Sequence, residues 1–522
     1  MRMTSPKSSP INKNLLGSWR VSGYRGDAAS QNVTSGDKLL NDQDRRKNHP
    51  GPAARRRRCR SEYAIIRVVP RSGWKTWLVV TLILSVIIVG TISFLGWRQS
   101  VPGVRAALVP PPAFIGLKTP LTLTLTAARG GVASLELRLV QGTQKVTAIQ
   151  QAFPPPRQNE QRLALTVEGR SLGLREGGAT LEVYAKDGFW RPIRVDDRPI
   201  LTQPVTLDLT PPTLDLLAAT QYLAQGGGGL VVYRAKGATR SGVNVGGIFF
   251  PGFAVGPADA GTHAAMVAVP YDFPVTSPIV LATQDEAGNS ASRSVSSQIR
   301  PRKFPRDSVD IKEEFIQRKL PELLPERGSV PPDQLLQAFL VVNRDKRRQA
   351  EETKRVISAK TQSKPLWQGA FLQPRNTKVF SNFAETRSYR FRGQDVDTQV
   401  HFGYDLASVK ESPVPAANRG TVVFAGLLTI YGNTVVLDHG LGLQTLYAHL
   451  SLIDVKEGQT VDKGTVLGRT GSSGLAIGDH LHYEVLIHGI SVTPLEWWDA
   501  RWIRDHILKP LREANVALIE GN

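Results

Sequence analysis

The chain has 522 residues, which is long enough for several domains that each bury a core of their own. Its apolar content of 41% is ordinary for a globular protein. The net charge of +20 is uneven, because residues 1–75 hold 17 Lys and Arg against 5 Asp and Glu, whereas the rest of the chain holds 48 against 40. This distribution argues against a protein that binds nucleic acid along its whole surface, and we expect no nucleic-acid partner.

Residues 1–75 predict a disordered basic tail without a catalytic role, because they are rich in Ser, Asn, Gly, Pro and charge and show no sustained apolar period. The arginine run at 55–60 has two interpretations. It can set membrane topology, or it can bind nucleic acid or anionic lipid; the apolar run that follows favours the first. The one cysteine, Cys59, lies in this tail, so the later domains have no disulfide.

The uncharged run of 22 residues between Lys75 and Arg98 predicts a transmembrane helix over residues 76–97. Trp77 and Trp97 lie near its ends, where aromatic anchors are typical. Basic residues are more frequent before the run than after it. The positive-inside rule therefore predicts a single-pass inner-membrane protein with a cytoplasmic N-terminus and periplasmic C-terminal domains. A cleaved signal peptide is the alternative, but the long preceding segment and the lack of a convincing cleavage site argue against it.

Short alternating runs follow, separated by turns rich in Gly and Pro. They include LTLTLT (121–126), LELRL (135–139) and ATLEVYAKDG (179–188). Alternation at period two predicts antiparallel β-sandwiches. A second unit begins near residue 206, and a weak repeat of about 100 residues links the two. Both resemble bacterial immunoglobulin-like (Ig-like) domains, which we expect at residues 98–210 and 211–303; such modules act as spacers or as binding surfaces, and the spacer role is the default.

Residues 304–366 predict a helical connector, with helices at 307–320 and 332–360 separated by prolines. Asp307 and Asp333 are the expected N-caps. Four apolar residues share one face of the second helix: Leu335, Leu336, Phe339 and Leu340. Residues 367–500 return to a β pattern, and residues 501–522 predict a helical tail.

Six of the nine histidines fall between residues 401 and 488, which indicates a common site. In HLHYEVLI the side chains of a strand alternate, so His480 and His482 point to one face while Leu481, Tyr483 and Val485 point into a core. HFGYD adds His401 and Asp405, with Gly403 allowing a close approach of the backbone. In isolation, H-x-H is more often a surface pair and H-x-x-x-D is common by chance; their co-occurrence in one β-rich domain favours a metal site.

His401, Asp405 and His482 are the expected ligands of one Zn²⁺ ion, because a hydrolytic zinc site uses about three N/O ligands and leaves one position for water. Zinc lowers the pKa of that water and so makes a nucleophile near neutral pH. His449 and His480 are the expected catalytic residues, which either take a proton from the water or hydrogen-bond the oxyanion. Both are expected to titrate near neutrality, which predicts a bell-shaped pH profile of the activity.

The segments HFGYDLA, PVPAANRGTVVFAG, YGNTVVLDHGLGLQTLYAHLS, VKEGQTVDKGTVLGRTGSSG and GDHLHYEVLIHG resemble, in order and in their glycines, the lysostaphin/LytM-type zinc metallopeptidases. The resemblance covers residues 367–498. It implies a compact antiparallel β domain with a groove across the sheet, the same five site residues, and peptidoglycan peptide stems as substrate. One departure is Ala384, where family members commonly have Gly, so the loop from Arg387 to Val400 and the rim of the groove are expected to differ.

The other histidines are expected to be structural. His439 is predicted to be a solvated or backbone-bonded turn residue, His488 a turn residue and His506 part of the helical tail. Tyr447 and Asn433 either line the groove or serve the fold. Gly458 and Gly464 resemble the turns of lipoyl-type modules, but they are interpreted as turn positions that tolerate positive φ.

The sequence as a whole thus predicts a mostly β, membrane-anchored zinc endopeptidase that cuts peptide cross-links of cell-wall peptidoglycan. The alternative is a LytM-like regulator that activates an amidase or organises division without catalysis of its own, although such members have typically lost zinc ligands. An additional adhesin or wall-binding role for the sandwiches stays open. The scissile bond is a D-alanine–diaminopimelate cross-link, a glycine bridge or another bond; an inner-membrane anchor favours the first.

Overall fold

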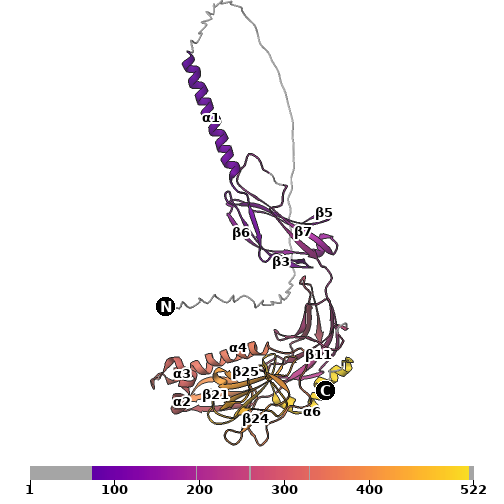
Figure 1. The fold of residues 1–522 in the computed structure, drawn as a ribbon, viewed down its shortest axis with the longest axis vertical. Helices are drawn as coiled ribbons and strands as arrows, with labels where there is room; N and C mark the ends of the chain where they lie inside the picture. The colour runs from indigo at the N-terminus through magenta and orange to yellow at the C-terminus, as the bar shows by residue number, and fades with distance from the viewer. Residues whose placement is uncertain (1–72, 195–196, 258–259, 329, 517–522) are drawn as a thin grey trace, which may run out of the picture. The chain divides into compact units, whose positions relative to one another are not determined.

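The computed structural model describes residues 73–194, 197–257, 260–328 and 330–516. These residues are mostly β, as predicted, with helices gathered in the connector and near the C-terminus after a first long helix (Figure 1). Residues 1–72 of the predicted basic tail, with Cys59, lie outside the described residues.

Helix α1 (Trp74–Ser100) contains the predicted transmembrane segment. Its most apolar window has a mean hydropathy of 2.7, and none of that window is buried. Among the described residues it is the one helix long and apolar enough to cross a membrane. Since a helix that is apolar all round and unburied needs an apolar medium, α1 is compatible with a single-pass membrane anchor.

The next segment forms two sheets around one core, with strand orders β1-β3-β6 and β2-β8-β7-β4-β5. The predicted alternation is confirmed in β3, where Leu121, Leu123 and Leu125 are buried and the threonines between them are not. The strands are β1 (Arg105–Leu108), β2 (Phe114–Ile115), β3 (Thr119–Thr126), β4 (Val132–Gln141), β5 (Gln144–Ala152), β6 (Glu160–Val167), β7 (Gly177–Asp187) and β8 (Leu201–Leu207).

A second two-sheet unit follows, with strand orders β14-β15-β11-β9 and β13-β12-β16-β17 and a short parallel pair β10-β18. Its core takes consecutive buried residues from β11 and β15, and the alternating residues Val243 and Val245 from β12. The strands are β9 (Thr213–Ala219), β10 (Tyr222–Ala224), β11 (Gly228–Lys236), β12 (Arg240–Val245), β13 (Ile248–Pro251), β14 (Phe253–Ala254), β15 (Thr262–Ala268), β16 (Ile279–Gln284), β17 (Ser290–Val295) and β18 (Gln298–Arg300). The Ig-like identity of both units stays a prediction.

The connector differs from the prediction at its start. Residues 306–311 form a strand, β19 (Arg306–Ile311), which pairs in parallel with β21 (Glu385–Phe391). The helix expected over 307–320 is therefore wrong for its first residues, and so is its Asp307 cap, whereas residues 313–320 are helical as predicted. Helix α2 (Glu313–Leu323) begins only afterwards and includes Pro321. The second predicted helix exists as α3 (Leu335–Leu340), a π-helical turn η4 (Val341–Lys346) and α4 (Arg347–Ser358), but Asp333 does not cap it.

The C-terminal β domain is built on one antiparallel sheet with the order β20-β23-β31-β27-β26-β25-β29, and β32 pairs with β31. A hairpin of β21 and β22 and a small sheet β24-β30-β28 flank it. The strands not yet given are β20 (Lys378–Ser381), β22 (Gln394–His401), β23 (Tyr404–Ala407), β24 (Pro413–Pro415), β25 (Gly420–Leu427), β26 (Asn433–Asp438), β27 (Leu443–Leu450), β28 (Leu452–Ile453), β29 (Thr460–Val461), β30 (Val466–Arg469), β31 (Leu481–Ile487) and β32 (Ile490–Val492).

The two faces of this sheet are covered by different segments. The face that bears Leu481, Tyr483 and Val485 shares a core with the second two-sheet unit and the C-terminal helices. The opposite face, which bears Leu446 and Leu486, packs on the connector helices α2, α3 and α4 (Figure 1). Helix α4 therefore lies directly over the face to which His482 points.

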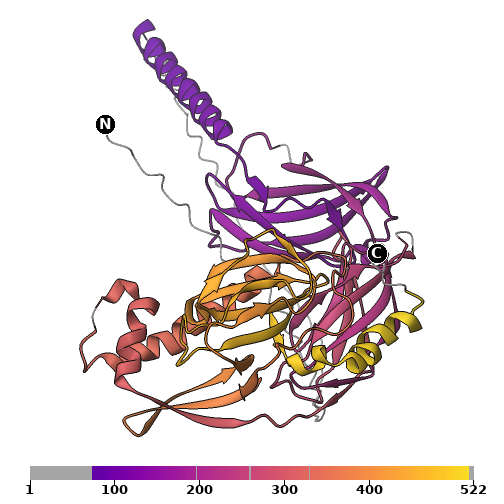
Figure 2. The same ribbon diagram turned by 60° about the horizontal axis from the view of Figure 1, so that its bottom comes forward.

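The predicted C-terminal helical tail (501–522) is helical where the structure describes it, in α6 (Ala500–Ile503), the π-helical η6 (Arg504–Leu508) and α7 (Lys509–Glu513). Helix α5 (Pro494–Trp498) precedes this tail, and residues 517–522 lie outside the described residues. Helix α7 lies beside β9 and β11 of the second two-sheet unit (Figure 2). The hydroxyl of Thr220 donates to the carbonyl of His506, and Gly228 N donates to the Glu496 carboxylate at 2.8 Å. The C-terminal helices and the second unit are thus joined through polar contacts as well as a shared core.

Candidate metal centre

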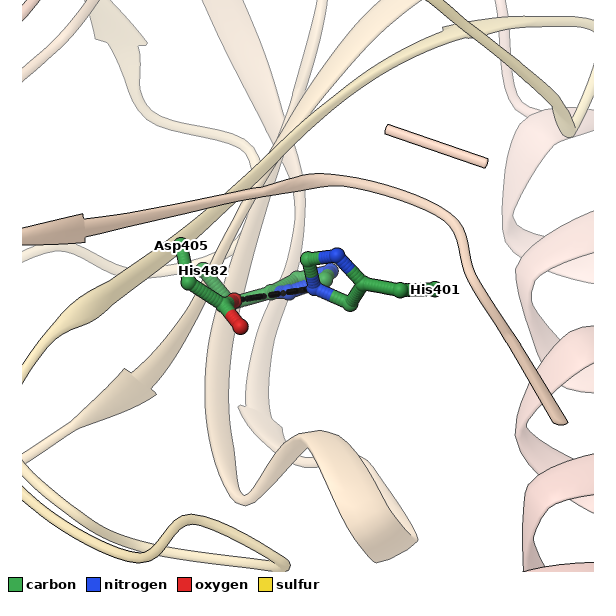
Figure 3. A group of neighbouring side chains, drawn as sticks. All are labelled: His401, Asp405 and His482. Carbon is green, nitrogen blue, oxygen red and sulfur yellow. Dashed lines mark hydrogen bonds and ion pairs between the residues drawn. The ribbon is translucent and has the colours of Figure 1, made fainter. Parts of the chain in front are cut away.

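Three side chains from three strands meet at one point on the helix-covered face of the sheet. His401 ends β22, Asp405 lies in β23, and His482 lies in β31 directly opposite Asp405 in the antiparallel register. Oδ1 of Asp405 lies 2.9 Å from Nε2 of His401 and 2.9 Å from Nδ1 of His482, and the two nitrogens are 2.9 Å apart (Figure 3). Among the described residues, these three form the group that could hold a metal ion.

Gly403 makes this convergence possible, as the sequence predicts. A Cβ at this position would lie 2.7 Å from Cε1 and Nε2 of His482 and 2.7 Å from the carbonyl oxygen of Tyr483. Such distances are shorter than van der Waals contact, so a side chain here would push the His482 ring away. The H-x-G-x-D spacing therefore has a steric cause in addition to supplying two side chains of the group.

The outer nitrogen of each imidazole is occupied by an acceptor. Nδ1 of His401 lies 2.9 Å from the carbonyl oxygen of Asn382, and Nε2 of His482 lies 2.9 Å from Oε1 of Glu484. Each outer nitrogen must donate its hydrogen to that oxygen, so in the neutral rings the lone pairs of the inner nitrogens face Asp405. Two imidazole lone pairs and one carboxylate oxygen directed at one point are a donor set that suits Zn²⁺.

The second oxygen of Asp405 is held by Arg387, whose Nη2 donates to Oδ2 at 2.8 Å. Nε of Arg387 also donates to Oε1 of Glu385 at 3.0 Å, which fixes the guanidinium between two carboxylates. Burial alone would raise the pKa of Asp405, but the hydrogen bonds and charges around it, first those of His401, lower it well below its usual range. Asp405 is therefore a carboxylate near neutral pH.

The pKa values of the two histidines that face Asp405 shift in opposite directions. Burial lowers the pKa of His401, so this ring is neutral near neutral pH. Burial also acts to lower the pKa of His482, but the hydrogen bonds to Asp405 and Glu484 outweigh it and raise the pKa. The position between Nδ1 of His482 and Oδ1 of Asp405 can thus be taken either by a proton or by a metal cation, which makes metal binding dependent on pH.

The two predicted catalytic histidines lie beside this group. Nδ1 of His449 lies 2.8 Å from the carbonyl oxygen of Ser473, and Nδ1 of His480 lies 2.8 Å from that of Gly478. Because both Nδ1 atoms donate to carbonyls, both Nε2 atoms are left to face the site; Nε2 of His480 is 3.5 Å from Oδ1 of Asp405. His449 has a φ of +61°, a conformation rare for residues with a Cβ, and such strain is common at functional sites.

One expectation about these histidines is wrong. Burial, and next the neighbouring His480 and His482, lower the pKa of His449 well below its ordinary value. This ring is therefore neutral at neutral pH instead of titrating there. The reason lies in the tertiary structure, because its strand is covered on both faces.

A pocket of about 480 Å³ opens onto the group. Its wall comes partly from the connector, through Val309, Phe315 and Phe339, and partly from Leu475 and Ile477 in the segment before His480. Helix α2 holds that segment in place. Nζ of Lys319 donates to the carbonyl of Ser472, and the Glu322 carboxylate accepts from Gly474 N.

The remaining histidines are structural, as expected, although His439 is buried and not solvated. Its ring lies 2.7 Å from the Arg419 carbonyl and 2.8 Å from the Thr445 hydroxyl. His488 is a turn residue with a φ of +49° whose ring stacks on Phe253, and His506 lies in helix η6.

Tyr447 and Asn433, for which two roles were open, serve the fold. The Tyr447 hydroxyl accepts a hydrogen bond from Ala417 N, and the Asn433 amide donates to the Leu450 carbonyl; neither side chain lines the pocket. Gly458 and Gly464 have φ values of +84° and +89°, so both are turn positions, as predicted.

The rim near Ala384 has an unexpected form. The segment 387–400 is a hairpin of β21 and β22, not a loop, and Ala384 has a φ of +57°. This is a backbone conformation that favours glycine, which accounts for the glycine expected at the position.

Sequence reasoning missed three residues that hold the side chains of this group in place: Glu484, Arg387 and Asn382. A signal for Glu484 was present, since it lies two residues after His482 and hence on the same strand face. Arg387 lies in β21 and Asn382 in the segment between β20 and β21, and neither has such a local signal.

Comparison with known proteins gives a consistent match to the C-terminal part of the chain. The model of peptidase family M23 matches residues 399–494. The DD-carboxypeptidase/endopeptidase Mpg of Neisseria meningitidis serogroup B is 38% identical over 117 residues, which are 22% of this chain and 27% of that protein. The peptidoglycan DD-endopeptidase ShyA of Vibrio cholerae serotype O1 is 40% identical over 96 residues, which are 18% of this chain and 22% of that protein.

These matches span about a quarter of the length of each curated relative. Among solved structures, the catalytic domain of the antimicrobial peptidase lysostaphin from Staphylococcus simulans is 26% identical with a TM-score of 0.21. That alignment covers 24% of this chain and 92% of the lysostaphin domain.

Proposed function

We propose that this chain, whose residues 399–494 form a peptidase family M23 domain, is a membrane-anchored zinc endopeptidase that hydrolyses peptide cross-links of cell-wall peptidoglycan. The proposal rests on one observation above all. Two imidazole nitrogens and a carboxylate oxygen, each 2.9 Å from the others, are aimed at one point by fixed partners. His401, Asp405 and His482 are the proposed zinc ligands, with one ion per domain.

A zinc ion bound there would act as a Lewis acid and lower the pKa of a water molecule that it binds. The chain's own residues supply the proton transfers. Nε2 of His449 and Nε2 of His480 face the site as proton acceptors, because both Nδ1 atoms donate to backbone carbonyls. A ring that has taken a proton at Nε2 can next donate it to the nitrogen of the leaving amine. Because Nε2 of each neutral ring carries a lone pair, the ring must accept a proton there before it can donate a hydrogen bond to an oxyanion.

The proposed substrate is the peptide stem of peptidoglycan. The pocket that opens onto the proposed zinc ligands has a volume of about 480 Å³, which lies within the usual range for pockets that bind small ligands and is large enough for part of a peptide. The related proteins of Neisseria and Vibrio are named endopeptidases, the latter acting on peptidoglycan, and this supports the substrate class. In the proposed arrangement, α1 anchors the chain in the inner membrane, the N-terminus lies in the cytoplasm and the β domains lie in the periplasm. This arrangement would bring the site to the cell wall.

Digestion of purified cell-wall sacculi by the full-length chain in detergent tests this proposal. We expect soluble fragments to be released, chelator to stop the release and added zinc to restore it. His401→Ala should lower the release to background, whereas His506→Ala, a histidine away from the group, should leave it unchanged. Mass spectrometry of the fragments identifies the bond that is cut.

Full activity of His401→Ala, or activity insensitive to chelator, would contradict the zinc mechanism. If the wild type releases nothing but increases the activity of a separately added cell-wall amidase, the regulator hypothesis replaces the enzyme hypothesis.

A further inference from the structure

A lysine is buried beneath the proposed ligand His482. Lys354 belongs to helix α4 of the connector, which precedes the matched segment 399–494 in the chain. Its side chain is fully buried, with 0% exposure, and so is its partner Glu484. Burying a charged pair is costly, so both groups need a complete set of partners in the fold.

The ammonium of Lys354 has three hydrogens and three close acceptors. Nζ lies 2.9 Å from Oε2 of Glu484, 2.9 Å from the hydroxyl of Tyr431 and 2.8 Å from Oε2 of Glu351. The Tyr431 hydroxyl itself donates to Oε1 of Glu351 at 2.8 Å. The direction of the ammonium is therefore set by α4 and by the sheet together.

The Glu484 carboxylate divides its two oxygens between different partners. Oε2 accepts from Lys354 and from the hydroxyl of Ser491 at 2.6 Å, while Oε1 accepts from Nε2 of His482 at 2.9 Å. Because Lys354 and Ser491 bind Oε2, the carboxylate cannot rotate, and Oε1 keeps a fixed position relative to the His482 imidazole. That contact determines which nitrogen of His482 carries the hydrogen and how the ring is turned.

We propose that Lys354 is a positioning residue for the metal centre: its ion pair with Glu484 orients His482 so that Nδ1 faces Asp405 and His401. This inference rests on the proposed metal-binding function. It makes the helical connector a structural part of the centre, although the connector supplies no ligand and lies outside the segment that matches the peptidase family.

The experiment measures the zinc affinity of the full-length chain in detergent by competition with a chromophoric chelator. Lys354→Met keeps the length of the side chain but leaves Glu484 without its cationic partner, and we expect zinc binding about tenfold to a hundredfold weaker. Arg348→Met is the matched control, because Arg348 lies on the same helix with its side chain 67% exposed, and its affinity should equal that of the wild type.

The double variant Lys354→Met/Glu484→Gln separates positioning from packing. Its neutral amide oxygen can still accept from Nε2 of His482, so we expect most of the zinc affinity to return. The visible spectrum of the Co²⁺-loaded chain should change in the single variant and return to that of the wild type in the double variant. A lysine that matters only through its packing would not be rescued in this way, since the double variant lacks its side chain too, and equal free energies of unfolding of the two variants without metal would exclude a general effect of the unpaired charge on the fold.

Wild-type affinity in the single variant, or a double variant that binds zinc as weakly as the single one, would overturn the inference. If Lys354→Met does not fold, Lys354→Gln takes its place, with a donor but no charge, and wild-type affinity there overturns the inference as well. A wild type that binds no zinc overturns the proposed function instead, which distinguishes the two failures.

Discussion

Gly403→Ala is a direct test of the geometry of the proposed centre, because it adds a single methyl group. The new Cβ would lie 2.7 Å from Cε1 and Nε2 of His482, whereas ordinary contact begins near 3.4 Å. The Tyr483 carbonyl, the other close atom, is held in the sheet between β23 and β31, so it cannot move away. The imidazole must therefore shift by about 0.7 Å. Backbone strain does not enter, because the φ of Gly403 is outside the left-handed region.

A displacement of this size removes His482 from the common point that it shares with His401 and Asp405. We expect zinc binding to weaken about tenfold to a hundredfold, equivalent to roughly 1.4–2.8 kcal/mol, and the domain to lose about 1–3 kcal/mol of stability from overpacking. Chelator competition measures the first quantity. Chemical denaturation in the presence of chelator measures the second without a contribution from bound metal.

Gly478→Ala is the control, because it lines the same pocket but a Cβ there meets nothing within 4 Å. It should retain wild-type zinc affinity and stability. If Gly403→Ala also binds zinc as the wild type does, then the ring of His482 does not need its observed position, and the assignment of His482 as a ligand is refuted.

Three further predictions concern the rest of the chain. Burial raises the pKa of Glu496 to about 7 from 4.5, so the folded state holds this proton more tightly than the unfolded state; the resulting stability is fully present below pH 4.5 and is lost as the pH rises through 7. Glu496→Gln should therefore have the stability of the wild type at pH 4.5 but be more stable by up to ~3 kcal/mol at pH 8. Unfolding in denaturant, followed by tryptophan fluorescence, measures this difference, and a difference that is constant across pH would contradict the assignment. Asp187→Ala should cost about 3 kcal/mol in the first two-sheet unit, because it leaves Arg191, bound at 2.7 Å and only 10% exposed, without its carboxylate; a loss below 1 kcal/mol in chemical denaturation would count against it. Ile87→Arg places a charge in the middle of α1, which costs roughly 2.5–3.5 kcal/mol for membrane insertion. Alkaline carbonate should therefore extract more of this variant from membranes than of the wild type, and unchanged retention would argue against a spanning helix.

Much of the local structure could be predicted from the sequence because it follows from short-range periodicity. The apolar run of α1 needs only its length and lack of charge, and the alternating leucines of β3 need only the two-residue period of a strand. The same period indicated that His480 and His482 share a face. Strand β19 was mistaken for a helix, since its pairing partner β21 lies some 75 residues later and nothing nearby marks it as a strand.

The sequence by itself determined which side chains were available for a metal and which of them share a strand face, since these properties depend on residues a few positions apart. Only the tertiary structure decided how those side chains are held. Arg387 and Lys354 reach Asp405 and Glu484 across 18 and 130 residues, and burial moves the pKa of His449 away from neutrality. Such contacts and such desolvation arise from packing between segments that are distant in the chain, so they cannot be predicted from the residues of a single strand or helix.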